Sequence, residues 1–66
     1  MFIELNIFLK LKNLASTGGQ AKQLIRSGLV LVNGIIETRN RRKLTAGDKV
    51  EVNSKKYLVT EDLLRD

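Results

Sequence analysis

Apolar residues are spaced as in helices over the first part of the chain and as in strands after Gly28. Near the N-terminus, three of them recur at intervals that place them on one face of a helix: Ile7, Leu11 and Leu14. Asn6 can cap a helix over about residues 7–13, and Asn13 tolerates the left-handed backbone that ends it. We therefore expect a first helix whose apolar face these three residues form.

A capping box predicts the start of a second helix. In the sequence Thr17-Gly18-Gly19-Gln20, the Thr17 hydroxyl can accept a hydrogen bond from the Gln20 amide, while the Gln20 side chain accepts one from the Thr17 amide. We expect a helix over residues 18–27, with Gly28 supplying the positive φ just past its last turn. Three residues line its apolar side: Ala21, Leu24 and Ile25.

After Gly28 the pattern becomes that of a β-hairpin. Residues 29–32 are apolar and rich in β-branched side chains, and Asn33-Gly34 is the strongest two-residue hairpin signal. Residues 35–38 then run back along the first strand. The following segment, 39–43, is too charged for a core strand.

Two more strands are expected toward the C-terminus. Ala46-Gly47-Asp48 reads as a turn before the alternating strand 49–52, and Asn53-Ser54 as a turn before a fourth strand over residues 57–59 that can pair with the third. Residues 61–66 fit either a short helical turn or a loose tail. The predicted fold is a mixed α/β (α+β) domain.

Composition limits the chain to one small domain and excludes much of catalytic chemistry. It has 66 residues, 42% hydrophobic, and no interrupting linker or repeat, so we expect a single domain over residues 1–66. It contains no Cys and no His, which excludes a disulfide scaffold, the usual zinc sites, a thiol nucleophile and a histidine base. We expect no enzyme, no metal, no cofactor and no small-molecule substrate.

Charge points to a polyanionic partner. Twelve Lys and Arg residues against seven Asp and Glu residues give a formal net charge of +5. Apolar stretches such as 29–32 and 35–36 fall far short of the roughly 20 residues that a membrane-spanning helix needs. The N-terminus carries acid and base within its apolar run and offers no small-residue cleavage site, which argues against a secretory signal. A cytoplasmic monomer is the expectation.

The second helix carries a candidate phosphate-binding stripe, which we define as Gly18, Gly19, Lys22 and Arg26. Lys22 and Arg26 share one face, away from the apolar side, although like charges four residues apart repel slightly. The glycines leave the first-turn amides uncovered at the positive end of the helix dipole. The alternative is a tight connection between helices beside ordinary solvated cations. No P-loop or GxGxxG pattern is present.

The densest charge cluster is the basic segment, which we define as residues 39–43. It holds four cations, Arg39, Arg41, Arg42 and Lys43, and three of them are arginines, which grip phosphates bidentately. A merely solubilising loop is the alternative. The aromatic residues are few and read as core rather than as stacking platforms: Phe2, Phe8 and Tyr57. The adjacent acids at 61–62 do not suggest a catalytic or metal site.

The chain resembles the RNA-binding domain named after ribosomal small-subunit protein four, here the S-four domain. The resemblance covers about residues 3–52 and rests on Leu24-Ile25, Gly28, Val30, Val32-Asn33-Gly34, Lys43 and Gly47-Asp48 in that order. Residues 17–22, TGGQAK, look like the mark of a short, stand-alone bacterial subfamily. The resemblance implies two helices packed on a small curved, mostly antiparallel sheet of about four strands, the αL motif.

The resemblance also implies which residues would contact structured, chiefly ribosomal, RNA. It places Thr17 and Lys22 at the family's hydroxyl and basic positions, with Gln23 and Arg26 farther along the helix. Asn33 matches the hairpin turn and Lys43 the basic position before the Gly-Asp turn.

We therefore expect a non-enzymatic RNA-binding protein that contacts phosphates of ribosomal RNA and takes part in ribosome assembly or maturation. The expected RNA-binding residues are Thr17, Gly18, Gly19, Lys22, Gln23, Arg26, Asn33, Arg39, Arg41, Arg42 and Lys43. One alternative is a protein-interaction module whose basic face docks on an acidic partner. A binder of anionic membrane surfaces is disfavoured, because the basic segment is predicted as a loop rather than an amphipathic helix.

Overall fold

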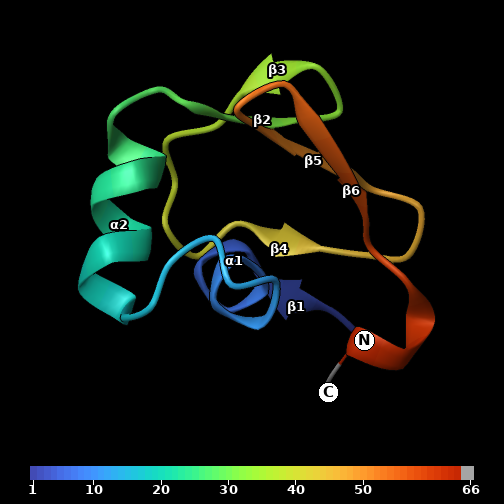
Figure 1. Ribbon diagram of the computed structural model, residues 1–66. Coiled ribbons are helices and arrows are strands. Elements are labelled where there is room, and N and C mark those ends of the chain that lie inside the picture. Colours follow the sequence, from blue (N-terminus) through green and yellow to red (C-terminus); the bar gives the residue numbers. More distant parts are fainter. Residues whose placement is uncertain (65–66) are drawn as a thin grey trace.

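Two helices, six short strands and a 3₁₀ turn make up residues 1–64, which the computed structural model describes (Figure 1). Along the chain they are β1 (Ile3–Glu4), α1 (Leu5–Leu11), α2 (Gly18–Arg26), β2 (Val30–Val32), β3 (Ile35–Ile36), β4 (Lys43–Leu44), β5 (Lys49–Val52), β6 (Lys55–Leu58) and η1 (Glu61–Leu63). This is the mixed α+β fold expected from the sequence. Neither helix in this range is long and apolar enough to span a membrane.

The strands form two antiparallel sheets. The larger one has the order β3-β2-β5-β6, and a second, two-stranded sheet pairs β1 with β4. The predicted hairpin is confirmed, and Asn33 and Gly34 both have positive φ, 53° and 82°. The pairing of the third and fourth predicted strands is confirmed as β5 with β6, although β6 begins at Lys55 because Asn53 and Ser54 complete the turn between them.

Helix α1 begins two residues earlier than predicted and without the predicted cap. It starts at Leu5, so Glu4 occupies the N-cap position and makes no side-chain cap. Its first amides bond instead to the basic segment: the Leu5 N–H donates to the Arg42 carbonyl at 2.8 Å and the Asn6 N–H to the Asn40 carbonyl at 3.1 Å. Distant carbonyls thus replace the expected Asn6 cap. The left-handed Asn13 after the helix, with φ 59°, is as predicted.

The apolar face predicted for α1 is wrong at two of its three residues. Ile7 and Leu11 are 39% and 52% exposed, whereas Leu14, beyond the end of the helix, is partly buried against the core. The helix itself buries Leu5, Phe8 and Leu9. The sequence of α1, LNIFLKL, carries apolar side chains around most of its circumference, so helical spacing alone fits more than one face. Packing against α2 and the sheets selects the face that is buried.

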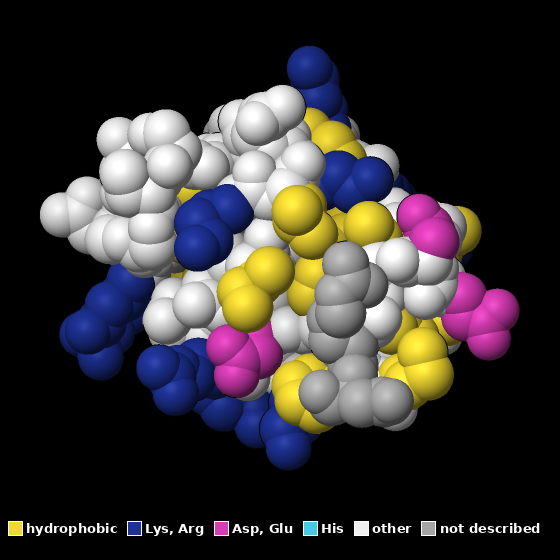
Figure 2. Space-filling model, turned by 90° about the horizontal axis from the view of Figure 1, so that it is seen from below, with side chains coloured by type: hydrophobic (Ala, Val, Ile, Leu, Met, Phe, Trp, Pro, Cys, Tyr) yellow, Lys and Arg dark blue, Asp and Glu magenta, His cyan; other side chains and the backbone are white. Residues whose placement is uncertain are grey.

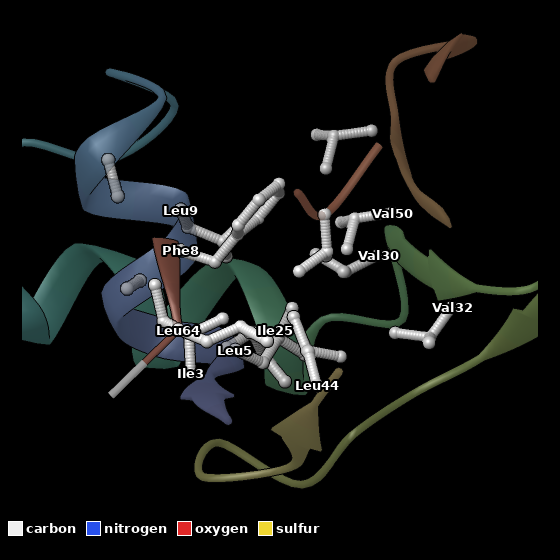
Figure 3. Packing of buried hydrophobic residues seen from close by; sticks show 14 residues of the cluster. Ile3, Leu5, Phe8, Leu9, Ile25, Val30, Val32, Leu44, Val50 and Leu64 are labelled. Atoms are coloured by element: carbon white, nitrogen blue, oxygen red, sulfur yellow. The ribbon is translucent and has the colours of Figure 1, made fainter. Parts of the chain in front are cut away.

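Helix α2 follows the prediction closely. It spans Gly18–Arg26, buries Ala21 and Ile25, leaves Leu24 half-buried against the core, and is followed by Gly28 at φ 83°. The core lies between the helices and the sheets (Figure 3), where the Phe8 ring points from α1 toward Val30 and Val50. Near the C-terminus the sequence allowed either a short helical turn or a loose tail, and η1 is the helical turn. Residues 65–66 lie outside the described range.

Candidate nucleic-acid interface

The start of α2 presents uncovered backbone amides. Thr17 caps the helix, since its Oγ1 accepts from the Gln20 N–H at 3.1 Å. No atom within residues 1–64 accepts a hydrogen bond from the Gly18 or Gly19 amide. A Cβ at Gly18 would meet nothing within 4 Å, and one at Gly19 only the Thr17 hydroxyl. An anion can therefore approach both amides at the positive end of the helix dipole.

The return half of the predicted capping box is wrong in one detail. The Gln20 Oε1 accepts from the Ser16 N–H at 2.9 Å and from the Ser16 hydroxyl at 2.6 Å, and not from the Thr17 amide. The acceptor reaches one residue farther back because Ser16 offers two donors to the same oxygen. The helix start is fixed from both sides, which keeps the free amides in place.

The remaining helix residues of the predicted site project into solvent. Lys22, Gln23 and Arg26 are exposed, whereas Ala21 and Ile25 are buried on the other side of α2. Among residues 1–64, Lys22 and Arg26 pair with no acid. Both cations are therefore available to a ligand.

The basic segment surrounds an open depression of about 460 Å³ lined by its four cations, Arg39, Arg41, Arg42 and Lys43. The prediction that Lys43 lies in a loop is wrong. Lys43 is the first residue of β4 and pairs in register with Glu4 of β1. Only Leu44 of this two-residue strand is buried, and the Lys43 side chain is exposed. The charge of Lys43 therefore does not oppose strand formation. The Lys43 Nζ lies 4.8 Å from the centre of the Phe2 ring.

Glu37 holds two of these arginines. Its side chain is 9% exposed; Oε2 accepts from the Arg39 Nε and Oε1 from the Arg42 Nη1, at 3.0 and 2.8 Å. The Arg39 Nη2 and backbone N–H add further hydrogen bonds, at 3.0 and 2.9 Å. The hydrogen bond from the Arg39 side chain contributes most to lowering the pKa of Glu37 far below its usual range; burial opposes this, and Arg42 adds to it. The same contact raises the pKa of Arg39.

We predict that this network makes stability depend on acid pH. Because the pKa of Glu37 is lower in the folded than in the unfolded state, its contribution is complete above the ordinary glutamate pKa of about 4.3 and is lost as the pH falls below it. Urea unfolding at pH 7 and pH 3 should show a larger loss of stability for the wild type than for Glu37→Gln. Equal losses would show that the ion pairs add nothing to folding.

Asn33 lies apart from the other predicted site residues. Its Nδ2 donates to the Asp48 Oδ1 at 3.1 Å, and its Oδ1 accepts from the Lys49 N–H at 3.0 Å. These bonds join the hairpin turn to the turn before β5. In Figure 1 the β2–β3 turn is at the end of the hairpin that points away from α2.

The backbone of the basic segment runs near α2 in the view of Figure 1. In Figure 1, α2 stands at the left, and the chain that follows β3 runs down beside it toward β4. Figure 2, seen from below, shows Lys and Arg side chains along the left and lower left and others toward the top, with one acidic side chain beside the lower-left group and others at the right. Basic side chains are thus numerous on the side of the molecule where α2 and the chain leading to β4 lie.

The chain is similar in sequence to a known protein family and to two bacterial proteins. Residues 1–60 match the model of the S4 domain, the family called S-four above. The chain is 46% identical over 48 residues to an Escherichia coli protein named "Putative RNA-binding protein YbcJ", covering 73% of this chain and 69% of that one. It is 44% identical over 50 residues to the Bacillus subtilis "Probable ribosome maturation protein RlbA", and the match covers 76% of this chain and 70% of that protein. The chain belongs to the S4 domain family.

Proposed function

We propose that this chain is a non-enzymatic RNA-binding protein that holds the sugar-phosphate backbone of structured ribosomal RNA. The observation that carries the proposal is the depression lined by the four cations of the basic segment, on a chain whose backbone runs near α2 (Figure 1). Helix amides and two α2 cations that have no partner within residues 1–64, together with a depression lined by four more cations, provide donors for several phosphates. As proposed, the protein acts as a cytoplasmic monomer in ribosome assembly or maturation.

The aromatic residues favour contacts to the backbone over stacked bases. Phe8 is fully buried, Tyr57 packs against the core, and Phe2 is half-buried beneath Lys43. Recognition of unpaired bases commonly uses exposed aromatic rings as stacking platforms. We therefore propose that the protein reads the shape and charge of folded RNA and has little preference for sequence.

The names of the two relatives support RNA as the partner. One is named for RNA binding and the other for ribosome maturation, and each matches about three quarters of this chain. Our proposal that the bound RNA is ribosomal rests on the second name and on the S4 domain match.

We predict a strong dependence of RNA affinity on salt. If about five phosphates are neutralised, the logarithm of the affinity should fall with the logarithm of the salt concentration at a slope on the order of −4. Fluorescence anisotropy with a labelled fragment of ribosomal RNA, titrated at several KCl concentrations, measures the slope. A flat response would contradict the proposal.

A nuclease control separates RNA binding from docking on an acidic protein. If RNA is the partner, treating a purified complex with nuclease should release the chain from ribosomal particles. An association that survives the loss of RNA would favour the protein-interaction alternative.

A further inference from the structure

We propose that Glu37 is a positioning residue for RNA binding, an inference that rests on the function proposed above. Its carboxylate fixes Arg39 and Arg42 at the depression before a phosphate arrives. An acid inside a basic surface would ordinarily be expected to weaken binding to a polyanion. The geometry points to the opposite effect.

The contacts of Glu37 use only part of each guanidinium. Arg39 donates through Nε and Nη2, and Arg42 through Nη1. An arginine has further N–H groups beyond these, so both side chains keep donors for another anion. The Arg39 side chain is 72% exposed and that of Arg42 30%, and both line the depression with Arg41 and Lys43. The two guanidiniums are thus held together and still reachable.

Glu37 also fixes the backbone that carries these side chains. The Arg39 N–H donates to its carboxylate at 2.9 Å, while the carbonyls of Asn40 and Arg42 accept from the first amides of α1. The segment is therefore anchored to the hairpin side through Glu37 and to α1 through its own carbonyls. A phosphate would meet an arrangement that is already formed.

Two physical effects of removing the Glu37 charge have opposite signs. Loss of one negative charge makes the region more positive and strengthens long-range attraction to RNA. It also leaves Arg39 and Arg42 without their shared counter-charge, so the two guanidiniums repel each other and spread. RNA binding must then immobilise two long, mobile side chains, and the loss of their conformational entropy weakens the affinity. Because both arginines touch the carboxylate directly, we expect the second effect to dominate.

The test compares Glu37→Gln with Glu61→Gln, which makes the same change of charge at an exposed position on η1. RNA binding is measured by anisotropy at 10 °C, with circular dichroism to verify that each variant is folded. Glu61→Gln should bind as tightly as the wild type or slightly more tightly. Glu37→Gln should bind about tenfold more weakly, the order expected when two side chains must be immobilised.

A second background separates positioning from a general loss of structure. In an Arg39→Ala/Arg42→Ala protein, Glu37→Gln should have no further weakening effect, because the side chains that Glu37 positions are absent. If Glu37→Gln weakens binding equally in both backgrounds, the residue acts through overall structure and the inference is wrong.

A measurement on the wild type keeps the inference testable if a variant fails to fold. The Arg39 Nε proton should exchange slowly with water in nuclear magnetic resonance spectra, and RNA should leave it protected, since the ion pair persists in the complex. Rapid exchange on addition of RNA would overturn the inference.

The same data distinguish this inference from the proposed function. If the wild type binds RNA but Glu37→Gln binds as tightly as Glu61→Gln or more tightly, the positioning role is wrong and RNA binding stands. If the wild type shows no salt-dependent binding, the proposed function fails and the positioning role fails with it.

Discussion

Reversing one charge in each half of the proposed interface, Lys22→Glu with Arg41→Glu, should weaken RNA binding about 100-fold at 0.1 M salt. This corresponds to about 1.4 kcal/mol for each reversed charge. Both side chains are exposed and form no ion pair within residues 1–64, so the fold should be retained. The salt slope should also become shallower by about two, since two phosphate contacts are lost. Anisotropy titrations over a range of KCl concentrations measure both quantities.

Arg41 is the better choice than Arg42 in this variant. The Arg42 side chain is 30% exposed and donates to Glu37. A glutamate at position 42 would place a second negative charge beside the buried Glu37 carboxylate and destabilise the fold. Two exposed lysines that are not among the proposed RNA-binding residues supply the control: Lys10→Glu with Lys55→Glu changes the net charge by the same amount. If the control weakens binding as much as the test variant, only the overall charge matters and no defined interface exists.

Phe8→Ala should destabilise the domain by about 3–5 kcal/mol, whereas Leu11→Ala should change stability by no more than about 0.5 kcal/mol. Phe8 is completely buried and Leu11 is 52% exposed, although both are large apolar residues of the same short helix. A domain of 66 residues is expected to have roughly 3–10 kcal/mol of total stability, so Phe8→Ala removes much or all of it. Urea unfolding followed by circular dichroism measures both values.

This pair of variants tests which face of α1 is buried. Comparable losses for Phe8→Ala and Leu11→Ala would contradict the packing described above. Leu24→Ala on α2 should fall between them, because Leu24 is half-buried against the core.

The turn signals and the Thr17 cap were predictable because they depend on a few neighbouring residues. Thr17 caps α2 as expected, Gly28 adopts the positive φ that ends it, and Asn33-Gly34 closes the hairpin. Each of these conformations is favoured by local hydrogen bonding or by the absence of a Cβ, without help from distant parts of the chain. The match to the S4 domain agrees with the order of these signals. A subfamily marked by residues 17–22 stays a prediction.

The candidate site was predictable only in part. The sequence identified the α2 stripe and the basic segment as candidate anion-binding features, yet nothing local indicated that the chain before β4 would run near α2 (Figure 1). Nothing in the local pattern indicated the role of Glu37, whose carboxylate contacts two of the four cations. Asn33 was assigned to the interface through the family resemblance, and the structure shows its side chain joining two turns.

The fold class, the start of α2, the hairpin and the excess of positive charge can be read from the amino-acid sequence alone. The buried face of α1, the carbonyls that satisfy its first amides and the pairing of Glu37 with Arg39 and Arg42 emerge only in the folded chain. Both outcomes have one physical reason. Periodicity and turn chemistry act over a few residues, whereas burial and ion pairing depend on which distant segments come into contact. A helix that is apolar on several faces, such as α1, can be packed in more than one orientation until those contacts form.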